Sequence, residues 1–117
     1  MSSAAVYERL SFDVLATFAP SGVEKLGLQK LRVDTQGVIF AALMNVAYIA
    51  ETSVVPGESQ DGLGGQWRVE CTLSRPLNPA EYTHLQSAIR GALASEQKEA
   101  PWLQQLAPEW HPAIPPG

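Results

Sequence analysis

The sequence is poor in charge: 17% of its 117 residues are Asp, Glu, Lys or Arg, whereas a typical globular domain has about 25%. Basic residues are the scarcer kind, with eight against twelve acids and a formal net charge of −4. Binding to a nucleic-acid backbone depends on clustered cations that release counterions from phosphates. The only basic group of this kind is Lys25, Lys30 and Arg32, so we expect no nucleic-acid partner.

Cysteines and long apolar runs are also scarce. Cys71 is the only cysteine, which excludes a disulfide within the chain and a metal site built of several thiolates. The longest uncharged apolar stretch, residues 38–50, is shorter than the ~20 residues that a membrane-spanning helix needs. The first residues lack the basic and apolar segments of a signal peptide. We therefore expect a cytoplasmic protein that has no membrane partner.

Apolar residues are plentiful, at 45% of the chain, and argue for a folded core rather than disorder. In two segments they occupy every second position, which is typical of a strand with one buried face. These residues are Leu10, Phe12, Val14, Ala16 and Phe18 in the first segment, and Trp67, Val69, Cys71 and Leu73 in the second. The polar positions between them indicate an antiparallel sheet with one face in water.

The clearest local signal is the start of a helix. Asn78 is a good N-cap, Pro79 suits the first helical position, and Glu81 is placed to complete a capping box. The helix should run to about Lys98, with an apolar stripe of Tyr82, Leu85, Ile89, Ala92 and Leu93. A shorter helix is predicted over residues 23–31, with Ser21 as its N-cap, followed by a turn at 34–37.

Residues 38–50 are apolar at both odd and even positions, so periodicity alone cannot separate a strand covered on both faces from a buried helix. We favour the strand, because β-branched and aromatic residues are spread through the segment and an extended pattern follows it. The predicted fold is α+β: a two-layer sandwich of a mainly antiparallel sheet of three to four strands, with two helices on one face. The ferredoxin-like order β-α-β-β-α fits it best.

The composition changes near residue 100. We predict a single α+β domain over residues 1–99 and a C-terminal tail over residues 100–117 that is rich in proline and tryptophan and contains a short helical turn at 101–107. Trp102 and Trp110 lie in this tail. Because tryptophan is a frequent anchor of interfaces, both are candidate partner-binding residues.

The sequence contains few groups that are suited to catalysis. His84, His111 and Cys71 share no metal-ligand spacing, and no nucleophile motif is present, so we predict no catalytic residue, no cofactor and no metal. Arg68 and Glu70 form a polar row on their strand and Arg75 follows it, which makes these three candidates for binding a ligand or a partner. An enzyme or ligand-binding domain with a site beneath the glycine-rich loop 56–65 is the alternative. Its site would use Arg68 with Glu51, Glu70 and His84.

The apolar surplus points to association. If two helices cover one face of the sheet, one apolar side of residues 38–50 stays uncovered, and large exposed apolar patches mark interaction sites. That side would show either Ile39, Leu43 and Ile49, or Phe40, Met44 and Tyr48. A second copy could cover it, or else the chain's own tail, through Trp102, Leu106 and Trp110. We therefore predict a small, soluble, non-catalytic interaction module that forms a homodimer or binds another protein.

Overall fold

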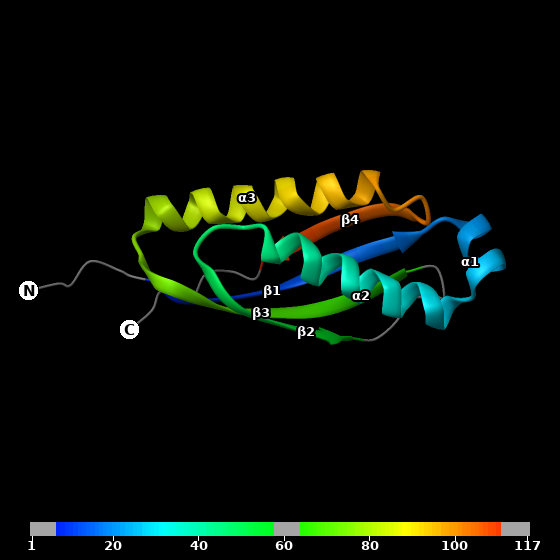
Figure 1. The fold of residues 1–117 in the computed structure, drawn as a ribbon, viewed down its shortest axis with the longest axis horizontal. Helices are drawn as coiled ribbons and strands as arrows, with labels where there is room; N and C mark the ends of the chain where they lie inside the picture. Colours follow the sequence, from blue (N-terminus) through cyan, green and yellow to red (C-terminus); the bar gives the residue numbers. More distant parts are fainter. Residues whose placement is uncertain (1–6, 58–63, 111–117) are drawn as a thin grey trace, which may run out of the picture.

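The structure is a computed structural model that describes residues 7–57 and 64–110. Within these ranges the chain forms an α+β fold whose four antiparallel strands lie in the order β2-β3-β1-β4. Helices α2 and α3 lie over one face of this sheet, and α1 lies at its end (Figure 1). The elements are β1 (Tyr7–Phe18), α1 (Pro20–Leu26), α2 (Leu28–Met44), β2 (Ile49–Pro56), β3 (Gly64–Leu77), α3 (Pro79–Lys98) and β4 (Leu103–Trp110).

The core lies between the sheet and the two long helices. The alternating apolar residues of β1 and β3 all point into it, as the sequence predicts, and each is at most 7% exposed. Leu85, Ile89 and Leu93 of α3 fill the space above them and are also buried. Trp67 folds its ring over Gly65, where an added Cβ would come within 2.8 Å of a ring carbon, so this strand position has room only for glycine.

The prediction of a strand over residues 38–50 is wrong, and so is the turn at 34–37. Residues 34–44 belong to α2, which ends at Met44, and only residues 49 and 50 of the predicted strand are extended, at the start of β2. Leu31, Thr35, Ile39 and Leu43 recur at helical spacing and are completely buried. The helix has one apolar side on the sheet and another turned away from it. Its residues are therefore apolar at odd and even positions alike, which is also the pattern of a strand covered on both faces.

The order of elements also differs from the predicted ferredoxin-like β-α-β-β-α with two helices. A third helix, α1, is divided from α2 by Gly27, whose φ of 82° is a backbone conformation that glycine tolerates. The N-cap of α1 is Ala19, not Ser21. The described helices number three, and the described chain ends in a fourth strand.

That fourth strand, β4, replaces the helical turn predicted at the start of the tail at 100–117. Leu103–Trp110 pairs antiparallel with β1 and buries Leu103 and Leu106. The segment lies at the edge of the sheet, where proline is tolerated because half of the backbone N–H groups have no partner strand. The paired residues are far apart in the sequence, as Phe18 with Leu103 and Phe12 with Trp110 show, so local propensity cannot predict the pairing.

At both edges of the sheet, glutamine side chains from the helices bond to backbone groups of the edge strand. On β2, Gln36 of α2 donates to the carbonyl of Val54 at 2.7 Å. On β4, Gln97 of α3 donates to the carbonyl of Gln104 at 2.8 Å and accepts from the N–H of Leu106 at 3.1 Å. Because unpaired edge groups are the usual site of strand addition, these contacts oppose association through the edges.

The capping box at the start of α3 is confirmed. The Asn78 side chain accepts from the N–H of Glu81 at 2.8 Å, and the Glu81 carboxylate accepts from the N–H of Asn78 at 3.1 Å. These two bonds satisfy backbone donors that have no partner within the helix. The helix ends at Lys98, where the apolar stripe predicts its end.

We expect Asn78→Ala to lower the free energy of unfolding by about 1 kcal/mol, because it removes the N-cap acceptor. Urea unfolding followed by circular dichroism measures the change. Asn78→Asp is the matched control and should keep nearly the full stability, since aspartate caps as well as asparagine. Equal losses in the two variants would contradict the role of the cap.

Candidate functional site

The face of the sheet opposite the helices is a polar surface, which we call the open face. Strand pairing places on it one residue in two from each strand, because paired residues project to the same side. Its members are Arg9, Ser11, Asp13, Leu15 and Thr17 of β1; Glu51, Ser53 and Val55 of β2; Gln66, Arg68, Glu70 and Thr72 of β3; and Gln105, Ala107 and Glu109 of β4. The surface thus carries charges of both signs.

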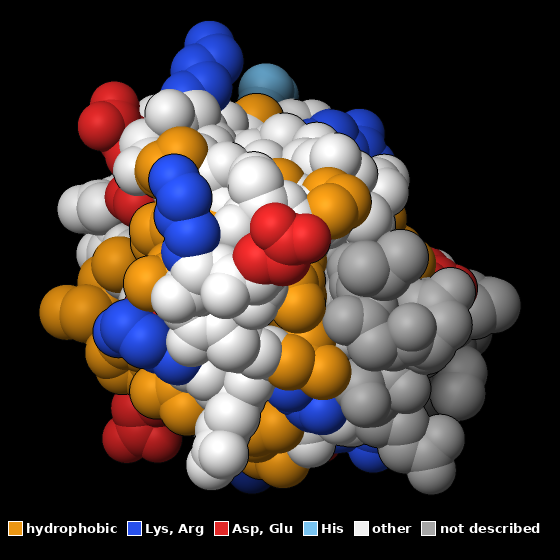
Figure 2. Space-filling model, turned by 90° about the vertical axis from the view of Figure 1, so that its right-hand side faces the viewer, with side chains coloured by type: hydrophobic (Ala, Val, Ile, Leu, Met, Phe, Trp, Pro, Cys, Tyr) orange, Lys and Arg blue, Asp and Glu red, His pale blue; other side chains and the backbone are white. Residues whose placement is uncertain are grey.

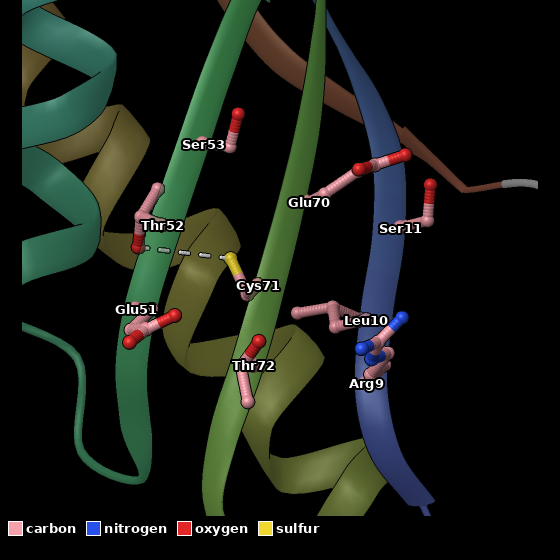
Figure 3. Close-up of a pocket in the computed structure, with 9 residues that line it drawn as sticks. All are labelled: Arg9, Leu10, Ser11, Glu51, Thr52, Ser53, Glu70, Cys71 and Thr72. Atoms are coloured by element: carbon pink, nitrogen blue, oxygen red, sulfur yellow. Dashed lines mark hydrogen bonds between the residues drawn. The ribbon is translucent and has the colours of Figure 1, made fainter.

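A shallow hollow of about 340 Å³ lies in the open face over β1, β2 and β3. Glu51 and Glu70 belong to its lining and lie on adjacent strands, with Glu51 across from Thr72 and Ser53 across from Glu70. Figure 3 shows the Glu70 side chain reaching from β3 toward Ser11 on β1. The hollow therefore combines two carboxylates, hydroxyl groups and the guanidinium of Arg9.

The predicted row of Arg68 and Glu70 does share one face, but only Glu70 lines the hollow. Arg68 is exposed beyond it, between Val55 on β2 and Asp13 on β1. The hollow also lies toward the start of β2, whereas the glycine-rich loop follows the end of β2. Residues 58–63 of that loop lie outside the described residues, and a site beneath the loop stays a prediction.

Sequence reasoning missed Asp13. Its position on a polar side of β1 predicts exposure, yet the side chain is only 6% exposed and accepts a hydrogen bond from Gln66 Nε2 at 2.7 Å. A buried carboxylate needs such partners to offset its lost hydration. Nothing in the alternation of β1 distinguishes Asp13 from its exposed neighbour Ser11, so no local signal could have identified it.

Arg75 is separate from the hollow. Its guanidinium makes an ion pair with the Glu81 carboxylate and lies over the ring of Tyr48, 4.8 Å from the centroid. The Arg75 contact, with help from the N–H of Asn78, holds the pKa of Glu81 below its usual value. Tyr48 has a φ of 72°, which is unusual for an aromatic residue, and its carbonyl accepts from the N–H of Ser74 at 2.7 Å. Arg75 thus joins β3, α3 and the bend before β2.

The two tryptophans of the predicted tail pack within their own chain. Trp102 is half-buried; its Nε1 donates to Thr35 Oγ1 of α2 at 3.3 Å, and its Cβ lies where a side chain on Gly22 would be. Trp110 packs its ring on Phe12, with ring centroids 4.6 Å apart. Their part in partner binding stays a prediction.

The remaining candidate groups are Cys71 and His84. The Cys71 thiol is buried 3.8 Å from Thr52 Oγ1, and burial raises its pKa despite that contact. A thiol that stays protonated is a poor nucleophile. His84 is exposed on α3. Across residues 7–57 and 64–110, no three metal-ligating side chains come together.

The apolar surplus is exposed on α2. We call Val33, Gly37, Phe40 and Met44 the outer stripe; its three side chains are 63%, 42% and 70% exposed in chain order. An apolar groove of about 500 Å³, which Val33 and Pro56 help to line, borders the stripe. In Figure 2 hydrophobic side chains gather at the left, the side that faces the viewer in Figure 1, where α2 lies. Of the two predicted sets, Phe40, Met44 and Tyr48 are exposed, whereas Ile39 and Leu43 are buried.

Comparison with protein-family models, with curated proteins and with solved structures finds no match in any of the three. No described helix is both long enough and apolar enough to cross a membrane. The function must therefore be argued from the surfaces described above.

We expect Arg75→Gln to raise the pKa of Glu81 toward its usual value, because the variant removes the main cause of its depression. The ion pair stabilises the fold above the carboxyl's unfolded pKa and is lost as pH falls through its folded pKa. The variant should therefore lose less stability on acidification. Carboxyl ¹³C titration and urea unfolding across the acid range measure both effects. Arg68→Gln is the control and should leave Glu81 unchanged.

Proposed function

We propose that this protein is a small interaction module without chemistry of its own, and that it associates with a second copy of itself through α2. The observation that supports the proposal is the outer stripe, where Val33, Phe40 and Met44 are exposed together along one side of α2. Apolar surface of this kind on one helix is typical of a protein interface. A cytoplasmic location and an acidic charge balance remain part of the proposal.

The other surfaces of the described chain are less suited to self-association. At the edges of the sheet, Gln36 and Gln97 already bond to three backbone groups of the edge strands. The open face presents charged and hydroxyl groups, whose desolvation costs free energy unless each finds a partner. The outer stripe is uncharged, so that burying it stabilises a complex without such a cost.

The C-terminal tail was the alternative partner for the apolar side of α2, but its described residues pack at other places in the fold. Trp102 contacts Thr35, Leu106 is buried in the core, and Trp110 contacts Phe12. Leu106 and Trp110 belong to β4 and Trp102 to the turn before it, and none of the three contacts named involves the outer stripe. Residues 111–117 lie outside the described residues, and a tail docked over α2 would appear in the test as a monomer at every concentration.

Light scattering after size exclusion should show a mass that rises from monomer to dimer between micromolar and near-millimolar protein. Val33→Lys should weaken the dimer about tenfold or more, because it buries an unpaired charge. Val55→Lys is the matched control: it changes the same residue type at similar exposure, 52% against 63%, but on the open face. A mass that stays monomeric throughout, or equal effects of the two variants, would refute the proposal.

A ligand-binding role is the second candidate, and the hollow on the open face favours it. Arg9 lies there with Glu51 and Glu70, a combination that suits a small ligand carrying both charges, such as a free amino acid. A thermal-shift screen of amino acids should find a stabilising ligand whose effect disappears in Glu70→Gln. The control is Glu109→Gln, which changes the open face outside the hollow. A screen without a hit rejects this candidate.

A further inference from the structure

We propose that the second copy packs its α2 antiparallel against this one, with the Phe40 ring of each copy seated over Gly37 of the other. This inference rests on the proposed self-association and adds its geometry. Successive members of the outer stripe are four, three and four residues apart. Two helices that pack along their length show this spacing in the residues of their interface. The stripe therefore suits a helix as its partner.

The stripe contains its own notch. Gly37 is exposed in the middle of α2, and a Cβ added there would meet no atom within 4 Å. Glycine in an exposed helix interior costs about 0.5–1 kcal/mol relative to alanine, and no contact within the described chain accounts for it. Phe40, 42% exposed, projects from the same stripe three residues later. A protruding ring and a gap thus lie side by side on one surface.

An antiparallel pair matches these two features. In an antiparallel pair with its two-fold axis between positions 38 and 39, two residues face each other when they lie equally far from the axis on opposite sides. Phe40 then faces Gly37 of the other copy, and Val33 faces Met44. A parallel pair would instead set Phe40 against Phe40 and Gly37 against Gly37. Two rings would then compete for the same space, and a gap would remain between the two glycines. Large side chains facing small ones fill an interface at the density of a protein interior.

Charge is consistent with a second copy. The outer stripe carries none, and Lys30 and Asp34 of the same helix form an ion pair with each other at 3.2 Å. On the other side the groove is lined by the neutral Gln29 and Gln36 and by Arg32, whose guanidinium donates to the carbonyl of Gly57 and lies over the Trp67 ring. Two such faces meet without like-charge repulsion, and antiparallel helices also oppose their dipoles favourably.

The size of the stripe sets the expected strength. Its three side chains are about half to two-thirds exposed, so with the bordering groove they offer on the order of 300–600 Å² of apolar surface. A stable interface buries about 800 Å² per partner, and smaller ones belong to weak or transient complexes. We therefore expect a dimer that forms in the micromolar range or weaker.

Gly37→Ala separates folding from association. The added methyl group should raise the thermal midpoint of dilute protein by a few degrees, since alanine favours the helix. It should also weaken the dimer about tenfold, because it fills the space of the Phe40 ring. Gly91→Ala on α3 is the matched control, because Gly91 is also exposed in mid-helix with no atom within 4 Å. It should raise the midpoint and leave the dimer unchanged.

Cross-linking tests the direction of the pair. The variants Val33→Cys and Met44→Cys are mixed and treated with a bismaleimide short enough to join only facing residues. Both variants keep native Cys71, which is 2% exposed and should not react. The antiparallel pair predicts a product between the two variants. It predicts none within either variant alone, since like positions are then offset by about 16 Å along the helix at about 1.5 Å per residue.

The outcomes distinguish this geometry from the proposed function. A Val33→Cys product with itself would overturn the antiparallel pair in favour of a parallel one. Absence of cross-links in a protein that light scattering shows to be dimeric, or a dimer that tolerates Gly37→Ala, would overturn this inference while leaving self-association standing. A mass that stays monomeric at every concentration would overturn both.

Discussion

The packing of α2 on the sheet constrains the rest of the structure. Leu31, Ile39 and Leu43 are completely buried against the strands, and their contact places the helix across β2 and β1, beside α3. A helix that is apolar on two sides can bury only one of them in a fold with a single layer of helices. The outer stripe is therefore exposed as a direct consequence of how the core is built.

The same helix also supplies polar contacts that limit where partners can bind. Gln36 reaches the edge of β2, and Arg32 donates to the carbonyl of Gly57 and lies over the ring of Trp67. On the opposite edge, Gln97 satisfies two backbone groups of β4. Backbone groups that already have partners gain little from another strand. In our proposal this leaves the apolar side of α2 as the surface for association, and the open face as a second, polar surface.

Much of the fold could be predicted from local patterns. The alternation in β1 and β3 places their buried residues correctly, and the capping residues Asn78 and Glu81 predict the start of α3. These signals are local, because they depend on side-chain direction within one element or on bonds across one helical turn. The candidate site was predictable in part, because Glu51 and Glu70 do share a face of the sheet. The burial of Asp13 was not predictable, because the alternation of β1 places it among the exposed polar residues.

The sequence by itself determined an α+β protein with too much apolar surface for its own core, few groups for catalysis, and one well-marked helix. Only the tertiary structure decided that residues 38–44 are helical, that Leu103–Trp110 is a strand of the sheet, and that Phe40 and Met44 are the exposed members of the surplus. The physical reason is the same in each case. An apolar run is compatible with a buried helix and with a covered strand. Contacts with residues far away in the sequence, such as that between Phe12 and Trp110, then decide which of the two forms.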